Sequence, residues 1–331
     1  MPTLNQIREA AQRIRPYAHR TPVLTCASLD LAVGAQVFLK CENFQKVGAF
    51  KFRGACNAVY SLDEAEAARG VATHSSGNHA QALALAARMR GIPAYIVMPS
   101  NAPAVKQAGV AGYGGQITLC EPTLAARETT LAAVAARTGA AIVHPYNDER
   151  VIAGQGTAAL ELLEEIPGLD VILAPVGGGG LLSGTAIAAT GLAPGIRVIG
   201  CEPQGADDAF RSLAEGRIIP SVQPKTIADG LLTSLGDLTF PIIRERVERI
   251  VTVSEPGIIA AMRFVWERAK LIIEPSSAVP LAVLWERRID LAGLRIGVIL
   301  SGGNVDLDHL PWQGLGTSPS QGTPVMHLPQ P

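Results

Sequence analysis

Short apolar runs rich in Val and Ile alternate along this chain with Ala-rich stretches whose apolar residues recur at helical spacing. Buried parallel strands covered by helices produce this alternation, because such strands are apolar on both faces. The pattern predicts helices at 4–14, 78–90, 102–111, 124–138 and 258–269, and strands at 36–40, 94–98, 116–119, 171–176, 198–201, 250–253 and 296–300. The fold class that follows is α/β.

The predicted elements fall into two groups. Those between 78 and 138 form one compact set, and the strands from 171 onward form a second. A chain of 331 residues, at roughly 150 residues per domain, also suggests about two domains. Residues 314–331 are rich in Gly, Pro, Ser and Thr, and we expect a flexible C-terminal tail there.

Composition and charge exclude several classes of protein. The formal net charge is -1 and the Lys and Arg residues are scattered, so the chain lacks the basic footprint of a nucleic-acid or membrane-surface binder. The 5 cysteines are widely spaced without a Cys-x-x-Cys pair, which argues against disulfides or a zinc ribbon. The N-terminus lacks a signal sequence. We therefore expect a cytoplasmic protein without a membrane or nucleic-acid partner.

Lys51 lies between two aromatic residues, Phe50 and Phe52. Apolar neighbours lower the pKa of a lysine by desolvating its charged form, and the neutral amine is a nucleophile toward carbonyls. Pyridoxal phosphate enzymes hold their cofactor through such a lysine, as a Schiff base. We predict this chemistry for Lys51. A surface lysine between core phenylalanines is the alternative interpretation.

A run of glycines follows the strand predicted at 171–176 and precedes a helical sequence. Its backbone N–H groups are unobstructed, and a helix N-terminus adds the positive end of its dipole, so a phosphate can bind there. A tight turn without ligand is one alternative. A nicotinamide dinucleotide site is a weaker one, because the spacing does not match Gly-x-Gly-x-x-Gly, although Glu202 follows the next strand. The candidate phosphate-binding residues are Gly177, Gly178, Gly179 and Gly180.

A polar turn lies directly before the helix predicted at 78–90. Hydroxyls and free amides at a helix start suit a substrate carboxylate, and Ser76 can also donate or accept a proton. Capping of the helix by Ser76 or Asn78 is equally compatible with the sequence. The candidate substrate residues of this turn are Ser75, Ser76, Gly77, Asn78 and His79.

Ser301 follows the strand predicted at 296–300. Ligands of open α/β sheets collect at the carboxyl ends of strands, so this hydroxyl could meet the ring nitrogen of a cofactor. A simple polar turn is the alternative, since Ser-Gly-Gly-Asn is typical of turns.

Taken in order, these motifs resemble the serine/threonine dehydratase and serine racemase family, which are pyridoxal phosphate enzymes of the tryptophan synthase β-like fold (fold type II). The resemblance spans residues 4–308 and is carried by four motifs: Lys51-Phe52-Arg53-Gly54-Ala55, Ser75-Ser76-Gly77-Asn78-His79-Ala80-Gln81-Ala82, Gly177 to Gly180, and Leu300-Ser301-Gly302-Gly303-Asn304. The resemblance implies that Lys51 is the Schiff-base lysine, Phe50 lies against the cofactor ring, Asn78 binds its 3-hydroxyl, the glycines cradle its phosphate and Ser301 meets its pyridine nitrogen.

The family's fold implies a large domain of residues 1–69 and 148–313 and a small, mobile domain of residues 70–147 inserted into it.

The implied reaction is β-elimination, in which Lys51 removes the α-proton, the β-hydroxyl leaves, and hydrolysis yields a 2-oxo acid and ammonia. A neutral Ser301 makes the cofactor a weaker electron sink, which favours elimination. L-Threonine and L-serine are the leading substrates. Serine racemase and 3-hydroxyaspartate dehydratase activities are the alternatives.

Two details resemble the racemase branch of the family. Ser76 stands where the biosynthetic threonine dehydratases commonly have Ala, and in the racemase branch a serine here is the acid/base on the face opposite the lysine. Glu202, the carbonyl of Ala206 and Asp208 resemble that branch's divalent cation site, and oxygen ligands suit Mg²⁺, Ca²⁺ or Mn²⁺. An acidic surface loop is the alternative for these residues.

Arg127 occupies the place where racemase-like members have an arginine that reaches the active site. A guanidinium there can pair with a carboxylate through two hydrogen bonds, which makes 3-hydroxyaspartate a plausible substrate. A solvated helix face is the alternative. Tyr146 stands where mammalian-type racemases have Asn after His-Pro, which argues against strict racemase function.

The family also implies a homodimer that acts on a small hydroxy amino acid. We expect a catabolic or racemase-like enzyme, because the sequence shows no regulatory domain after the catalytic core of the kind that the biosynthetic threonine dehydratases have. A different class stays open, namely a pyridoxal-phosphate-binding protein without turnover. The presence of Lys51, Ser76 and Asn78 argues against it.

Overall fold

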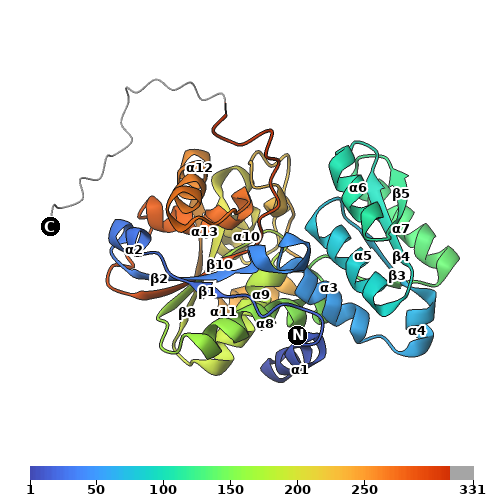
Figure 1. Cartoon of the computed structure of the whole chain (residues 1–331), viewed down its shortest axis with the longest axis horizontal. Helices are drawn as coiled ribbons and strands as arrows, with labels where there is room; N and C mark the ends of the chain where they lie inside the picture. The colour runs from blue at the N-terminus through green and yellow to red at the C-terminus, as the bar shows by residue number, and fades with distance from the viewer. Residues whose placement is uncertain (314–331) are drawn as a thin grey trace.

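The structure is a computed structural model that describes residues 1–313, and in it the chain folds around two β-sheets (Figure 1). The larger has six strands in the order β1-β2-β10-β7-β8-β9, and the smaller has four in the order β5-β4-β3-β6. β1 is antiparallel to β2, and the other pairings within both sheets are parallel. The predicted α/β class is confirmed.

The strands are β1 (Val23–Leu24), β2 (Gln36–Cys41), β3 (Val71–His74), β4 (Ala94–Pro99), β5 (Gln116–Cys120), β6 (Ala141–Ile142), β7 (Val171–Pro175), β8 (Arg197–Pro203), β9 (Arg249–Val253) and β10 (Arg295–Leu300). The helices are α1 (Leu4–Ile14), α2 (Ala27–Val33), α3 (Lys51–Tyr60), α4 (Glu64–Arg69), α5 (Asn78–Arg90), α6 (Ala104–Gly112), α7 (Leu124–Thr138), α8 (Glu149–Glu165), α9 (Gly180–Leu192), α10 (Asp208–Glu215), α11 (Thr239–Arg246), α12 (Glu255–Phe264) and α13 (Pro275–Trp285).

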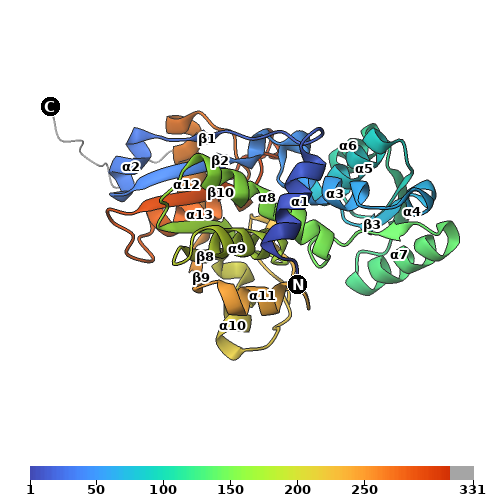
Figure 2. The same cartoon turned by 90° about the horizontal axis from the view of Figure 1, so that it is seen from below.

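The six-stranded sheet is covered by helices on both faces (Figures 1 and 2). Val171 and Leu173 of β7 pack into the core on the side of α2, α12 and α13. Ile172 and Ala174 pack into the core on the side of α1, α8, α9 and α11. Successive side chains of a strand point to opposite faces, so a strand buried on both sides must be apolar throughout. This is why the central strands are uninterrupted apolar runs.

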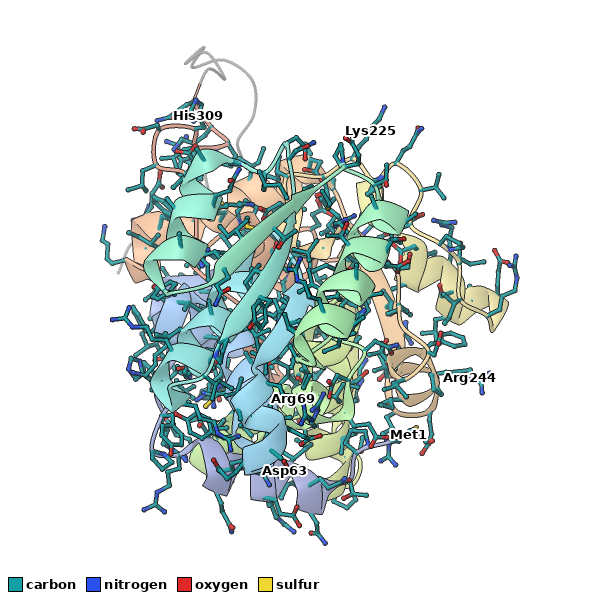
Figure 3. All side chains as sticks on the ribbon, turned by 90° about the vertical axis from the view of Figure 1, so that its right-hand side faces the viewer. Met1, Asp63, Arg69, Lys225, Arg244 and His309 are labelled. Carbon is teal, nitrogen blue, oxygen red and sulfur yellow. The ribbon has the colours of Figure 1, made fainter. Side chains whose placement is uncertain are left out.

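The four-stranded sheet is built from residues 71–142, and α3, α5 and α6 share a core with one of its faces while α7 packs on the other. Figure 3 looks onto this part of the molecule from its outer side, with Asp63 and Arg69 marking the two ends of α4. Asp63 caps that helix, and Arg69 Nε donates to the carbonyl of Gly139 at 3.0 Å. The division into domains at residues 70 and 147 stays a prediction.

The path of the chain places the glycine turn and the ends of β2 and β10 near one another. β10, the last strand, pairs with β2 on one side and β7 on the other, all in parallel. The residues that follow these strands therefore meet at one edge of the large sheet, where ligands of parallel α/β sheets bind. Lys51, Gly177 and Ser301 come from these three connections.

Several boundaries differ from the sequence prediction. The helix predicted at 258–269 begins earlier, at Glu255, because Ser254 caps it by accepting from Gly257 N at 3.1 Å. It then widens into a π-helical turn over Val265–Ala269. The predicted flexible tail, residues 314–331, lies outside the described residues. Among residues 1–313, every helix is too short or too polar to span a bilayer.

Candidate active site

Lys51 is the first residue of α3, and its amine lies against a backbone carbonyl. Lys51 Nζ donates to Pro145 O at 2.9 Å, and the nitrogen lies 5.2 Å from the centre of the Phe50 ring. Burial lowers the pKa of Lys51 to about 8, against the opposing effect of the negative charge of Glu274. A fraction of this amine is therefore neutral near neutral pH, as a nucleophile toward a carbonyl requires.

The glycine turn leads from β7 into α9, and the ring of Tyr146 lies against it. A Cβ added at Gly178 would lie 2.3 Å from the Tyr146 ring, and one at Gly180 would lie 3.0 Å from Tyr146 Cα. Gly179 has φ +88°, a conformation that other residues rarely adopt. In the described part of the chain no side chain caps α9, so the first amides of that helix are available to an anion.

Ser301 is buried at the end of β10 and is joined directly to the segment that carries the lysine. Its carbonyl accepts from Phe50 N at 2.9 Å. Its hydroxyl lies 3.1 Å from Ser277 Oγ, and Ser277 Oγ in turn donates to Gly302 O at 2.6 Å. The hydroxyl of Ser301 is thus held by neutral partners, which suits a neutral contact to a ring nitrogen.

Asn78 begins α5, and two residues from the far end of the chain fix its side chain. Asn78 Nδ2 donates to the carboxylate of Glu274 at 3.1 and 3.3 Å. Asn304 Nδ2 donates to Asn78 Oδ1 at 2.9 Å, and Asn304 N donates to Glu274 at 3.3 Å. Burial raises the pKa of Glu274 to about 7. The orientation of the Asn78 amide is therefore set by an acid that titrates near neutral pH.

The turn before α5 holds the remaining predicted substrate residues. Ser75 Oγ accepts from Gly77 N at 3.3 Å, while Ser76 is half-buried in the same turn. His79 is buried with its Nε2 3.2 Å from Val143 O, and burial holds its pKa well below the usual range. A neutral His79 adds no charge beside the lysine.

Three aromatic rings form a row near the lysine, with an arginine at its end. The His144 ring lies edge-on to His74 at 5.8 Å and to Tyr146 at 4.5 Å. Burial and then the neighbouring His74 lower the pKa of His144 to about 4, and its Nδ1 accepts from Asn147 N at 2.9 Å. His144 is therefore neutral, with Nε2–H as its donor. Burial and the positive charge of Arg127 lower the pKa of His74, so Arg127 lies near this row.

The predicted cation residues lie at the end of β8, which includes Glu202, and in the turn that leads from it into α10, which begins at Asp208. Glu202 is buried and accepts from Ala209 N at 2.9 Å and Phe210 N at 2.8 Å, and burial raises its pKa to about 9. Asp208 is also buried, and burial raises its pKa to about 6 against the opposing effect of the Ser221 side chain. Within residues 1–313 neither of its carboxylate oxygens has a partner at normal hydrogen-bond geometry. Ala206, which lies between these two residues in the sequence, is buried as well.

The described residues contain no group of three or more His, Cys, Asp or Glu side chains that could hold a metal ion. The predicted set has only two such side chains, the carboxylates of Glu202 and Asp208, and its third ligand is the backbone carbonyl of Ala206. The unpartnered carboxylate of Asp208 is the feature that fits a cation, because a buried charge without a partner is costly.

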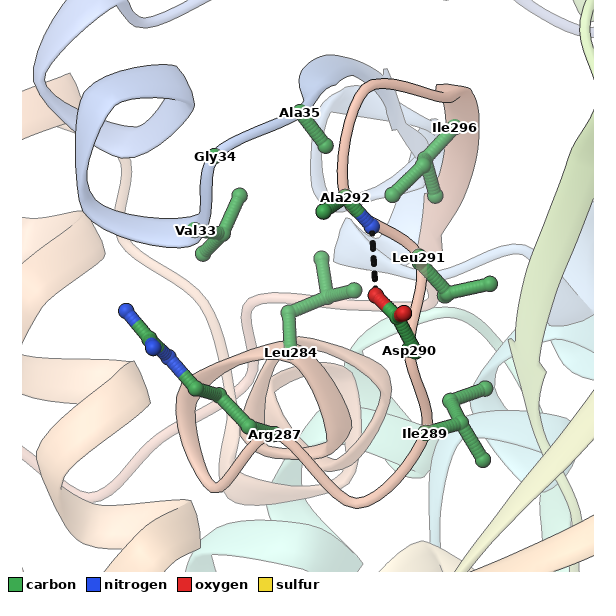
Figure 4. A pocket seen from close by; sticks show the side chains of 10 residues that line it. All are labelled: Val33, Gly34, Ala35, Leu284, Arg287, Ile289, Asp290, Leu291, Ala292 and Ile296. Carbon is green, nitrogen blue, oxygen red and sulfur yellow. Dashed lines mark hydrogen bonds between the residues drawn. The ribbon is translucent and has the colours of Figure 1, made fainter.

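A cavity of about 360 Å³ lies at the opposite end of the large sheet from Lys51 (Figure 4). Ala35 and Ile296, near the amino ends of β2 and β10, help to line it, and its Asp290 accepts from Ala292 N at 3.2 Å. Substrate sites of parallel sheets lie at the carboxyl ends of the strands instead. We therefore place the candidate active site at Lys51 and not in this cavity.

Sequence reasoning missed Glu274, Ser277 and the carbonyl of Pro145. Glu274 follows the apolar residues Leu271, Ile272 and Ile273, so an acid ending an apolar run was the available signal. Its partners Asn78 and Asn304 lie far away in sequence, and only the folded chain brings them together.

Comparison with known proteins gives a consistent family. A family model described as pyridoxal-phosphate dependent enzyme matches residues 14–302. The chain is 54% identical over 312 residues to a beta-hydroxyaspartate dehydratase of Paracoccus denitrificans (strain Pd 1222), covering 94% of this chain and 99% of that protein. It is 52% identical over 317 residues to a serine racemase of Arabidopsis thaliana, covering 94% and 96% of the two chains.

A solved structure supports the same fold. The crystal structure of serine racemase from Dictyostelium discoideum superposes with a TM-score of 0.88 at 50% identity, covering 92% of this chain and 99% of that one. The tryptophan synthase β-like arrangement that the motifs implied is that of these enzymes.

Proposed function

Because the chain belongs to the family of pyridoxal-phosphate-dependent enzymes, and within it to the ammonia-lyases and racemases, we propose that it converts 3-hydroxyaspartate to a 2-oxo acid and ammonia. The observation that carries this choice of substrate is that Arg127 lies close enough to His74 to lower its pKa, while the His74 ring lies edge-on to His144. A β-carboxylate would give this guanidinium a partner, whereas serine and threonine have none to offer. The names of two similar proteins support the same substrate class.

The residues present fit pyridoxal phosphate. Lys51 would hold the cofactor's aldehyde carbon, the amides from Gly177 to Gly180 its phosphate, and Ser301 its ring nitrogen. The turn suits a phosphate because a side chain at Gly178 would collide with Tyr146, so backbone alone faces the ligand. When bound, the cofactor supplies an electron sink for the bond that breaks at the substrate's α-carbon.

The chain's own residues then have distinct tasks. The neutral amine of Lys51 takes the α-proton and holds it, which its lowered pKa allows. Arg127 binds the β-carboxylate, and the turn from Ser75 to His79 offers hydroxyl and amide donors to the α-carboxylate. Glu274 keeps the Asn78 amide in one orientation, so that this donor is positioned before the substrate arrives.

Serine racemisation is the second candidate, and Ser76 is the residue that favours it. Ser76 is half-buried in the turn before α5. There its hydroxyl can exchange a proton with the substrate on the face opposite to Lys51. Several serine racemases are about as similar to this chain as the hydroxyaspartate enzymes are. L-Serine and L-threonine, which the sequence analysis predicts as the leading substrates for elimination, belong to the same substrate panel.

We also propose a divalent cation, Mg²⁺, Ca²⁺ or Mn²⁺, at Glu202, Ala206 and Asp208. The support is the buried, unpartnered carboxylate of Asp208 within the described residues. An oxygen-seeking cation would give it a counter-charge.

The test is a substrate panel. The purified chain, loaded with pyridoxal phosphate, is incubated with L-serine, L-threonine, D-serine and both 3-hydroxyaspartate diastereomers, and keto acid, ammonia and chirality are measured. The highest kcat/KM is expected with a 3-hydroxyaspartate diastereomer. A higher value with L-serine or L-threonine would overturn the substrate assignment. Cofactor binding without keto acid or inversion from any substrate would show a binding protein instead.

A further inference from the structure

Arg53, two residues after Lys51 on α3, is fully buried and makes two paired contacts with carboxylates. Its Nε and Nη2 donate to the two oxygens of Glu42 at 2.7 and 2.8 Å. Its Nη1 and Nη2 donate to the two oxygens of Glu161 on α8, both at 2.8 Å. Two carboxylates held by one planar guanidinium form a geometry that Lys cannot reproduce.

The same cluster is electrically balanced by Lys40. Lys40 Nζ is buried on β2 and donates to Glu161 at 2.6 Å and to Thr21 O at 2.7 Å. Two cations therefore face two anions. The one remaining N–H of Arg53, on Nη1, donates to Thr157 Oγ1 at 3.1 Å. A cluster this complete is rigid, because every displacement would leave a buried charge unpaired.

The Arg53–Glu42 pair joins the two ends of the segment 42–53, which carries Lys51. Within this segment Val47 has φ 56° and Gly48 has φ 68°. A positive φ is unfavourable for a β-branched residue such as Val47, so the turn keeps this shape only if its surroundings enforce it. Asn304 holds the middle of the turn by donating to Val47 O at 2.8 Å. The buried ion pair holds its ends.

We propose that Arg53 is a positioning residue for Lys51: by pairing with Glu42 and Glu161 it fixes the segment 42–53 and thereby holds the Lys51 amine in its desolvated place against Pro145. The proposal rests on the assignment of Lys51 as the cofactor lysine. It gives the Arg53 cluster a positioning role, which the proposed reaction alone does not require. If the segment loosened, water would reach the amine and its charged form would be favoured.

The test measures the pKa of the Lys51 amine in the folded, cofactor-free chain. Acylation of Lys51 by acetic anhydride is followed against pH by peptide mass spectrometry in the wild type, Arg53→Lys, Arg53→Met and Glu42→Gln. Lys51 of the wild type is expected to titrate with a pKa of about 8. The three variants should move the midpoint upward by about one pH unit or more, a tenfold or larger loss of neutral amine at a given pH.

Lys40→Met is the matched control. It removes one cation from the same buried cluster, as Arg53→Met does, but Lys40 lies outside the segment 42–53. The titratable groups nearest the amine, Glu274, His79 and His144, are unchanged in every variant. Lys40→Met should lower the unfolding midpoint while leaving the Lys51 midpoint near its wild-type value.

Equal Lys51 midpoints in the wild type and all folded variants would overturn the proposal and leave Arg53 a purely structural residue. A shift of the same size in Lys40→Met would also overturn it. If Arg53→Met does not fold, Arg53→Lys and Glu42→Gln decide the matter, since the first keeps the positive charge and the second keeps the shape of the side chain that it replaces. Failure of the substrate panel would not change these labelling curves, so the two proposals fail separately.

Discussion

The carboxylate of Glu274 accepts both of its contacts with Asn78 from one amide nitrogen, at 3.1 and 3.3 Å, and so ties the start of α5 to the start of α13. A second bridge, Lys106 Nζ to Asp229 at 2.7 Å, joins the same two parts of the molecule. The Glu274 carboxylate is buried and its contact with Asn78 is partly buried, whereas the Lys106–Asp229 bridge is exposed, so the first contact is the stronger constraint on how the two parts meet at the site.

Replacing Glu274 by Gln should make the Lys51 amine easier to deprotonate. The negative charge of Glu274 raises the pKa of Lys51 and opposes the larger effect of burial, so its removal should lower that pKa below about 8. The pH dependence of Lys51 acylation in the cofactor-free chain measures it. Glu286→Gln, near the other end of α13, is the control and should leave the midpoint unchanged. An unchanged midpoint in Glu274→Gln would contradict the prediction.

Glu274 should also make stability depend on pH. Burial raises its pKa from 4.5 to about 7, so between these values the folded chain binds more protons than the unfolded one. Stability should therefore fall as pH rises through this window, by up to about 1.4 kcal/mol per pH unit from this group. Glu202 and Asp208 also have raised pKa values, so the informative quantity is the difference between wild type and Glu274→Gln.

Urea unfolding of both cofactor-free proteins at about pH 5 and about pH 7.5 measures that difference. The loss of stability over this interval should be smaller in the Gln variant. Identical losses in the two proteins would show that Glu274 does not titrate in this range.

A methyl group at Gly178 should disrupt the glycine turn. The Cβ of Gly178→Ala would lie 2.3 Å from the Tyr146 ring, so the ring or the turn must move. Overpacking of this kind costs about 1–3 kcal/mol, and we expect weaker binding of pyridoxal phosphate with it. Equilibrium dialysis of the cofactor and thermal unfolding measure the two effects. Gly112→Ala, whose Cβ would meet open space, should change neither.

The second variant Tyr146→Ala sharpens this test. If the collision with the ring causes the loss, combining Tyr146→Ala with Gly178→Ala should restore part of the cofactor affinity lost in Gly178→Ala. Additive losses would show instead that the turn itself cannot accept a side chain.

Addition of Mg²⁺ should stabilise the chain through Asp208. Its buried carboxylate has no hydrogen-bond partner among residues 1–313, so a bound cation would relieve an unfavourable charge. At about 100 times the dissociation constant, binding adds about 3 kcal/mol of stability. Thermal unfolding with and without Mg²⁺ measures it. The gain should vanish in Asp208→Asn and persist in Asp207→Asn, whose carboxylate already pairs with Arg211 at 2.8 Å.

The regular elements were predictable where a periodic pattern has clear ends. The predicted helix 124–138 matches α7 to the residue, because Thr123 caps its start and Gly139, at φ 70°, ends it. β6 has two residues, Ala141 and Ile142, which is too short to show a period. The π-helical turn at Val265–Ala269 was not predictable either, since its apolar spacing continues that of α12.

The candidate site divides in the same way. Lys51 and the glycine turn were visible because their chemistry is local: an amine between aromatics, and backbone without side chains. Glu274 and the Arg53 cluster were not, because each depends on partners more than 100 residues away, such as Asn78 for Glu274 and Glu161 for Arg53. A charged residue in an apolar stretch indicates that a partner exists, but the fold is needed to say which one.

Replacing Arg127 by Ala should change which substrate the enzyme prefers. Arg127 lies on α7 near His74, and a hydrogen bond to a charged group contributes about 1.5–3 kcal/mol. The variant should therefore lose about 10- to 100-fold in kcat/KM for 3-hydroxyaspartate, while kcat/KM for L-serine, which has no β-carboxylate, should stay within about twofold. Arg137→Ala, at the exposed far end of the same helix, is the control and should affect neither substrate. Equal losses for the two substrates would show that Arg127 binds the α-carboxylate or supports the fold, and the choice of substrate would then have to come from another residue of the row formed by His74, His144 and Tyr146.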